Sequence, residues 1–306
     1  MSRRRAKGRP VNGVLLLDKP LGISSNRALQ IVKRLFNANK AGHTGSLDPL
    51  ASGVLPICLG EATKFSSWLL DADKRYQTVC KLGELTTTGD AEGEVIETLD
   101  VPDLDQDAIL ATLGRFKGEI KQVPPMYSAL KHNGQPLYKL ARQGLEIERK
   151  SRQVTIYDID LLARSDNTLT LDVRCSKGTY IRTLAEDIGK SLGCGAHITM
   201  LRRTEAARFG IDQCYTLEAL EACLEQSGTG ALDDLLLPTD CMLSDWPLVT
   251  LEDQATKYVL QGRTIKHIPV EDTGWVRIRG SSGQFIGIGE LNPTGELVPR
   301  RLISEN

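Results

Sequence analysis

The pattern of apolar and polar positions divides the chain into a large mixed α/β part and a small β-rich part at the C-terminus. Residues 75–82 and 168–175 alternate between apolar and polar side chains, which predicts two half-buried strands. Residues 13–18 form a short apolar strand that closes in a Pro/Gly turn. A second apolar run, at residues 54–59, directly follows a glycine-rich loop.

Three segments have the spacing of amphipathic helices. The first follows Ser24 and Ser25, either of which can cap it. The second spans residues 180–192 and is stopped by a glycine. The third is an acidic segment at residues 217–237.

The remaining patterns predict the domain organisation. Residues 122–152 contain two consecutive prolines and two glycines, and we expect a long insertion there rather than a core element. Strand patterns between glycine-rich turns near the C-terminus indicate a compact all-β module. We therefore expect a basic, disordered arm over residues 1–9, a main domain over residues 10–245 and a module over residues 246–306 that packs against it.

Composition excludes several classes of protein. The 306 residues are 41% hydrophobic and 25% charged, an ordinary globular balance. The longest aliphatic stretch near the N-terminus is too short for a signal or membrane segment, so we expect a cytoplasmic protein without membrane contact. The seven cysteines form no C-x-x-C pair, and the four histidines have no ligand spacing, so reduced thiols and no metal are expected.

The net charge of −1 conceals a segregation of charge along the chain. Residues 90–107 hold eight acids and no Lys or Arg, whereas basic residues concentrate in residues 3–9, 115–152 and 174–208. Such basic patches suit a polyanion that is gripped on one side. Taken alone, charge runs of this kind more often mark solvated helix faces.

The most informative loop carries a single carboxylate, Asp48, directly before Pro49. A lone carboxylate held in a tight loop suits a nucleophile or an electrostatic stabiliser better than a two-carboxylate glycosidase. On physical grounds alone, an Asx-turn is the commoner meaning of Asp-Pro. His43, in the same loop, could contact RNA, although a lone histidine is more often structural.

Five long motifs stand out along the chain. The most distinctive is GHTGSLDPLASGVLPICLGEATK at residues 42–64. The others, in order along the chain, are NGVLLLDKPLGISS (12–25), KRYQTVCKLGELTTTGDAEG (74–93), VPPMYSALKHNGQPLYKLAR (123–142) and RCSKGTYIRTLAEDIGKSLGCGAHITMLRRT (174–204). Together these motifs resemble those of the bacterial tRNA pseudouridine-55 synthase (TruB) family.

The resemblance implies a fold and an activity. The fold would be a mixed α/β, mainly antiparallel-sheet catalytic domain followed by a small PUA-like RNA-binding domain. The activity would be isomerisation of uridine-55 in the T-loop of tRNA to pseudouridine, after base flipping and without a cofactor. The partner would be the tRNA T-arm, with no metal and no membrane, and we expect a monomer.

The resemblance also implies roles for individual residues. Asp48 would act on the sugar or the base, and attack at C1′, attack at C6 and assistance to a glycal route all stay open. Arg182 would pair with Asp48 and lower its pKa. Tyr76 would stack on the target uracil and could transfer a proton at C5. Tyr180 and Leu201 would line the same pocket. His43 would fill the space left by the flipped base. Lys19, Pro20 and Lys64 would shape the floor of the site.

A non-catalytic RNA-binding or tRNA-chaperone protein on the same scaffold is the alternative. The segregated charge and the C-terminal module require only binding. Asp48 distinguishes the two hypotheses, because a pure binder needs no acid beside RNA phosphates. An enzyme acting on small molecules is disfavoured by the long basic insertion and by the absence of cofactor motifs.

Overall fold

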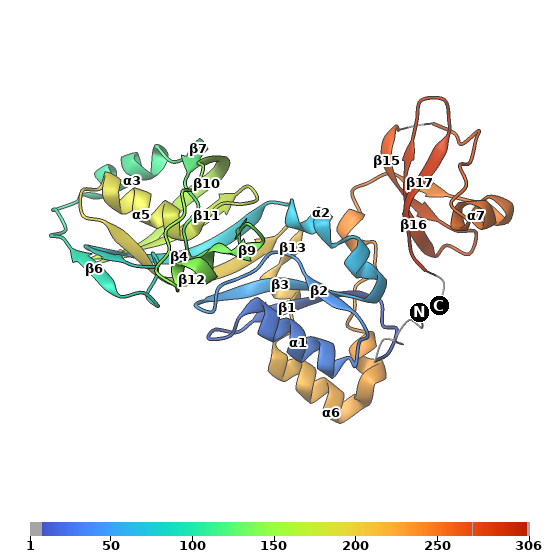
Figure 1. Cartoon of the computed structure of the whole chain (residues 1–306), viewed down its shortest axis with the longest axis horizontal. Coiled ribbons are helices and arrows are strands. Elements are labelled where there is room, and N and C mark those ends of the chain that lie inside the picture. Colours follow the sequence, from blue (N-terminus) through green and yellow to red (C-terminus); the bar gives the residue numbers. More distant parts are fainter. Residues whose placement is uncertain (1–7, 271, 305–306) are drawn as a thin grey trace.

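The computed structural model describes residues 8–270 and 272–304, which form a large sheet, a second sheet of four strands and two small two-stranded sheets (Figure 1). The large sheet has nine strands. Seven of them lie in the order β1 (Gly13–Lys19), β3 (Ala51–Leu59), β12 (Ala196–Ala206), β4 (Lys74–Leu82), β11 (Thr168–Cys175), β10 (Arg152–Ser165) and β7 (Gly118–Gln122). The short strands β2 (Ala41–His43) and β13 (Phe209–Gly210) pair with β3 and β12.

The large sheet is antiparallel apart from one junction, where β3 and β12 run parallel through Ala51–Leu201 and its two neighbouring pairs. Every residue of β3 is buried, because helices and loops cover both of its faces. The expected mixed α/β fold with a mainly antiparallel sheet is confirmed.

Helices cover different parts of this sheet (Figure 1). Under β1 and β3, α1 (Ser25–Leu35) and α6 (Leu217–Asp233) contribute to one apolar core. At the other end, α3 (Gln106–Gly114) and α5 (Ile181–Ser191) cover β4, β10 and β11. The first residues of α5, Ile181 and Arg182, line a pocket together with Tyr76 of β4 and Leu201 of β12. This end of the helix thus lies near the middle of the sheet.

Two predicted boundaries differ from the structure. The acidic helix ends at Asp233 rather than at residue 237, because Leu237 instead exchanges backbone hydrogen bonds of 2.9 and 3.0 Å with Val14 at the edge of β1. Residues 1–7 of the predicted disordered arm lie outside the described residues. Arg9, at its end, is ordered, since its backbone bonds to Asn37 and Asn39 and its side chain pairs with Asp233.

Short elements complete the main part of the chain. The predicted insertion between β7 and β10 contains β8 (Lys131–His132), β9 (Gln135–Pro136) and α4 (Leu137–Ala141). A separate hairpin pairs β5 (Glu84–Thr86) with β6 (Val95–Thr98). The other helical turns are the 3₁₀ segments Gly60–Lys64, Ile211–Gln213 and Cys241–Leu243 and the short α2 (Ser66–Leu70).

The second sheet packs against the main part through an aromatic junction. Its strands are β14 (Leu248–Thr250), β15 (Gly274–Arg279), β16 (Phe285–Leu291) and β17 (Leu297–Leu302), with α7 (Asp253–Leu260) beside them. Phe65 is fully buried against Leu243 and Ile288, and its ring centroid lies 5.3 Å from that of Phe285. No helix in the described part of the chain is long and apolar enough to cross a membrane.

Candidate active site

Asp48 lies on the loop between β2 and β3, and three backbone contacts hold that loop in place. The Ser25 hydroxyl accepts a hydrogen bond from Leu47 N at 2.7 Å and donates one to Leu47 O at 3.0 Å. On the other side of Asp48, Gly22 N donates to Pro49 O at 2.9 Å. The peptide that carries the carboxylate is therefore fixed from both sides by the segment that begins α1.

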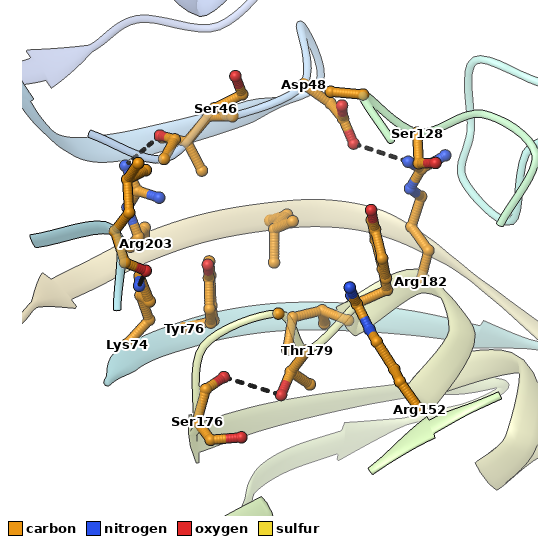
Figure 2. A pocket seen from close by; sticks show the side chains of 18 residues that line it. Ser46, Asp48, Lys74, Tyr76, Ser128, Arg152, Ser176, Thr179, Arg182 and Arg203 are labelled. Atoms are coloured by element: carbon orange, nitrogen blue, oxygen red, sulfur yellow. Dashed lines mark hydrogen bonds and ion pairs between the residues drawn. The ribbon is translucent and has the colours of Figure 1, made fainter. Parts of the chain in front are cut away.

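Arg182 pairs with Asp48 from the first turn of α5, with 3.0 Å between Nη2 and Oδ2 (Figure 2). Its side chain is only 6% exposed. The guanidinium also donates to Thr88 O at 2.8 Å and to Tyr127 O at 2.6 Å, and lies 3.5 Å from Asp90 Oδ2. Four acceptors in three separate segments thus fix both the position and the plane of this cation.

The pKa of the Asp48 carboxyl is raised from its ordinary value. Although 48% of its side-chain surface is exposed, loss of hydration in the pocket is the largest cause. Arg182 opposes this rise, and the negative charge of Asp90 adds to it. Arg182 does lower the pKa of Asp48, as expected, but desolvation outweighs its attraction, so the net direction of the shift is upward.

A pocket opens on one side of Asp48, and it unites most of the residues that the sequence singled out. Tyr76 comes from β4 and Leu201 from β12, and Tyr180 immediately precedes α5. Figure 2 shows Asp48 and Arg182 at one end of the pocket and Lys74 and Arg203 at the other, with Tyr76 between them. Burial raises the pKa of the Tyr76 hydroxyl.

His43 lies on the other side of Asp48. It lines a second recess together with Pro49 and Glu92, and its Nδ1 atom is buried without a hydrogen-bond partner among the described residues. Burial lowers the pKa of its imidazole, and the nearby Arg203 charge adds to that effect. Asp48 therefore separates two recesses, both of which can admit parts of a ligand.

Lys19 lies beneath the site rather than in the lining of either recess. It is fully buried, and its Nζ donates to Pro20 O at 2.8 Å and to Ile23 O at 2.7 Å. Burial is the main cause that lowers the pKa of Lys19 to about 8. Lys19 thus shapes the turn that leads from β1 to Ser25, and Pro20 belongs to the same turn.

Lys64 is not part of the site, contrary to the sequence-based expectation. Its Nζ pairs with Glu61 at 2.5 Å and donates to Leu302 O at 2.9 Å and to Ser304 Oγ at 3.1 Å. Strand β3 and a 3₁₀ turn lie between Asp48 and Lys64 in the sequence. Lys64 therefore lies at the junction with the second sheet. It helps hold the two sheets together.

The arrangement provides no metal site in residues 8–270 and 272–304, where no three His, Cys, Asp or Glu side chains could hold an ion together. All seven cysteines are free thiols. Burial raises the pKa of several of these thiols, those of Cys58 and Cys80 to about 12. They are therefore poor nucleophiles.

Comparisons with known proteins identify the family. The description "TruB family pseudouridylate synthase (N terminal domain)" matches residues 33–181, "tRNA pseudouridylate synthase B C-terminal domain" matches 182–244, and "Pseudouridine synthase II TruB, C-terminal" matches 247–303. The tRNA pseudouridine synthase B of Nitrosococcus oceani is 56% identical over 301 residues, which cover 98% of this chain and 97% of that protein. The chain belongs to the TruB family.

Other relatives agree with this assignment. The tRNA pseudouridine synthase B of Pseudomonas aeruginosa is 55% identical over 295 residues, covering 96% of this chain and 97% of that protein. Among solved structures, a chain of a Cbf5-Nop10-Gar1 complex has a TM-score of 0.73 at 26% identity, with 99% of this chain and 91% of that chain covered. Membership of the TruB family makes the chain a tRNA pseudouridine synthase, an isomerase, which confirms the resemblance drawn from the motifs.

The structure adds residues to the TruB-family site that the sequence did not single out. Arg203 is 1% exposed and donates to Val54 O at 2.6 Å and to Gly45 O at 3.2 Å. The two-residue period of strands could have placed it on the same face as Leu201. Asp90 had no such signal, because it lies on a turn whose position depends on contacts distant in sequence.

We predict that Ser25→Ala slows the reaction of this TruB-family protein about tenfold or more, with little change in RNA affinity. The substitution removes both hydrogen bonds that hold Leu47, and small displacements of a reacting group cost large factors in rate. Single-turnover rates and the Kd for a T-arm hairpin measure the two effects.

Ser24→Ala is the matched control. Ser24 caps α1 by accepting from Arg27 N at 3.2 Å and, although it lines the recess beside Asp48, makes no hydrogen bond to the Asp48 loop among the described residues. Its loss is expected to cost about 1 kcal/mol of stability and to leave the rate near that of the wild type. Equal rates for Ser25→Ala and the wild type would show that the hydroxyl does not position Asp48.

Proposed function

We propose that this chain isomerises uridine-55 in the T-loop of tRNA to pseudouridine, using the carboxylate of Asp48 and no cofactor. The N1–C1′ bond breaks, a C5–C1′ bond forms, C5 loses a proton and N1 gains one. Substrate and product are isomers, so the conversion needs neither an oxidant nor a group donor. The observation that carries this proposal is the Asp48–Arg182 pair at the end of a pocket that also contains Tyr76.

The pocket has the chemistry that an extruded pyrimidine needs. A base in a folded T-loop has to leave its stack, at a cost of a few kcal/mol. Tyr76 offers an aromatic ring for stacking, and Leu201 offers an apolar wall. We assign the space vacated by the base to His43, whose imidazole lines the recess beside Asp48.

Asp48 is oriented to react rather than to support the fold. Its partner Arg182 is anchored by the carbonyls of Thr88 and Tyr127. The carboxylate is therefore already paired with a fixed cation before the base enters the pocket. Attack at C1′, attack at C6 and proton abstraction toward a glycal would all use the carboxylate of Asp48. Each requires Asp48 to be ionised.

We assign RNA binding outside the pocket to two regions. The insertion at residues 122–152 contributes exposed basic side chains, among them Lys139, Arg142 and Lys150. We further propose that residues 246–306 form a PUA-like RNA-binding domain on a catalytic domain of residues 10–245, and that the protein acts as a monomer.

The non-catalytic alternative fits this site poorly. Asp48, Asp90 and Glu92 all lie within or beside the recesses, where they would repel RNA phosphates. An RNA chaperone gains nothing from such acids, whereas an isomerase needs one of them.

Asp48→Asn is expected to abolish turnover and leave folding and RNA affinity nearly unchanged. Asparagine has the same shape as aspartate but cannot act as a carboxylate nucleophile or base. Tritium release from RNA that contains 5-tritiated uridine measures the reaction, and release by the variant at more than a trace rate would contradict the role of Asp48.

Arg182→Lys is expected to slow single-turnover conversion of a T-arm hairpin on the order of a hundredfold. Lysine keeps the charge but lacks the planar fork that now reaches two carbonyls and two carboxylates. RNA affinity should change far less than the rate. A wild-type rate would remove Arg182 from the catalytic residues.

Asp90→Asn is expected to move the acid limb of the kcat/KM–pH profile to lower pH. The active form of Asp48 is the carboxylate, which is lost as the pH falls through its raised pKa. Removing the Asp90 charge removes one cause of that rise. The remaining amide oxygen can still accept from Thr88 Oγ1 and Glu92 N.

Asp187→Asn serves as the control for this profile. It removes a carboxylate from α5 that is not among the charges acting on Asp48. Its acid limb should coincide with that of the wild type. An unmoved limb in Asp90→Asn would show that Asp90 does not influence the ionisation of Asp48.

A further inference from the structure

Three arginines line the pocket, and they differ in how the protein uses their donors. Arg182 and Arg203 each donate to two backbone carbonyls, and Arg182 also faces two carboxylates. Arg152 belongs to none of the sixteen ion pairs found in residues 8–270 and 272–304, and its side chain donates no hydrogen bond to any of these residues. Its Nε atom is buried and unpartnered. Among the described residues, it is the pocket arginine whose terminal Nη donors the protein leaves unused.

The surroundings of Arg152 are built to hold its guanidinium in place. The cation lies over the ring of Tyr180, with 4.6 Å from Cζ to the ring centroid. It also passes close to Gly178, where a Cβ atom would come within 3.3 Å of Cζ. Figure 2 shows the side chain extending from β10 into the pocket toward Thr179.

A second contact fixes the ring that supports Arg152. Gln122 pairs with Arg152 across β7 and β10, and its side chain bonds to the backbone of Tyr180 at 3.1 Å to N and 3.3 Å to O. Arg152, Gln122 and Tyr180 therefore form one connected unit. A guanidinium held this firmly has lost much of its side-chain freedom before any ligand arrives, which favours binding.

A partly buried, unpaired cation requires an anion to offset its lost hydration. The target uracil is neutral, and the negative groups of a uridine in RNA are its two flanking phosphates. The planar fork of a guanidinium matches two non-bridging phosphate oxygens. Tyr76 and Leu201 already offer stacking and apolar surfaces for the base elsewhere in the pocket.

We propose that Arg152 binds a phosphate adjacent to the flipped uridine and thereby sets the position of its ribose relative to Asp48. This inference rests on the proposed function, because it takes a flipped uridine as the ligand. It gives Arg152 a role distinct from that of the exposed basic residues of the insertion. Those residues neutralise the RNA backbone at large, whereas Arg152 contacts one phosphate at the site of reaction.

A cycle that combines a protein change with an RNA change tests the proposal. The protein change is Arg152→Ala. The RNA change replaces one phosphate of a T-arm hairpin, on the 5′ or the 3′ side of the target uridine, by an uncharged methylphosphonate. Each modified hairpin is compared with an otherwise identical hairpin that carries the ordinary phosphate. Kd and single-turnover rate are both measured, so that the cycle can be evaluated from binding if the wild type does not turn over.

We expect Arg152→Ala to weaken Kd or to slow the reaction roughly ten- to a hundredfold. One of the two methylphosphonates should impair the wild type by a similar factor but change Arg152→Ala by less than about threefold, because the contact is already lost. Arg152→Lys should recover part of the effect. Thermal unfolding of Arg152→Ala should remain cooperative, which separates loss of the contact from loss of the fold.

Lys150→Ala is the matched control, since it removes one positive charge two residues away from an exposed position outside the pocket lining. It should keep the full sensitivity of the wild type to the critical methylphosphonate. The proposal would be overturned if Arg152→Ala had the Kd and the rate of the wild type. It would also be overturned if each methylphosphonate impaired Arg152→Ala by the same factor as it impairs the wild type. Failure of the wild type to convert the unmodified hairpin would instead contradict the proposed function.

Discussion

The geometry of the site depends on the buried guanidinium of Arg182. Removing such a cation from water costs several kcal/mol unless its donors are matched. The matching acceptors come from three segments that are far apart in the sequence: the Asp48 loop, the turn of Thr88 and Asp90, and the backbone at Tyr127. Because one cation needs all of them, the Asp48 carboxylate, the acidic turn and the basic insertion are brought together at the start of α5.

The scaffold around this cation confines the Asp48 loop from the opposite side. Ser25 and Gly22 hold the peptides next to Asp48, and Arg203 reaches Gly45 from β12. The parallel pairing of β3 with β12 sets Arg203 opposite Gly53, where a Cβ atom would lie 2.1 Å from the Arg203 carbonyl oxygen. A side chain at position 53 would separate these strands, so the glycine has a steric cause and its φ of +104° is readily adopted.

The local sequence pattern predicted helices and strands well where one face of the element is buried and the other is exposed. The alternation at residues 168–175 coincides with β11, and Ser24, one of the two candidate caps, is the N-cap of α1. The roles of Asp48 and Arg182 came from the family resemblance, because no local rule pairs residues 134 positions apart. Lys64 was misassigned for the same reason: it shares a motif with Asp48, but a buried nine-residue strand carries it to the other sheet. The direction of the Asp48 pKa depends on burial, which a sequence does not reveal.

The positively charged side chains in and beneath the pocket fall into two groups. Most of them are bonded to the protein itself, and one is left to contact the ligand. Lys19, Lys74, Arg182 and Arg203 all donate to backbone carbonyls, so their charges are held in place and partly compensated before RNA binds. Lys19 and Lys74 have pKa values lowered to about 8, chiefly by burial, so part of the positive charge in and beneath the pocket is sensitive to pH. Since an arriving nucleotide excludes water, it strengthens the attraction between Arg182 and Asp48 while it brings its own phosphate charge. Arg152, which has no ion pair and donates no side-chain hydrogen bond among the described residues, is the group suited to meet that charge, while Arg182 is already paired with Asp48.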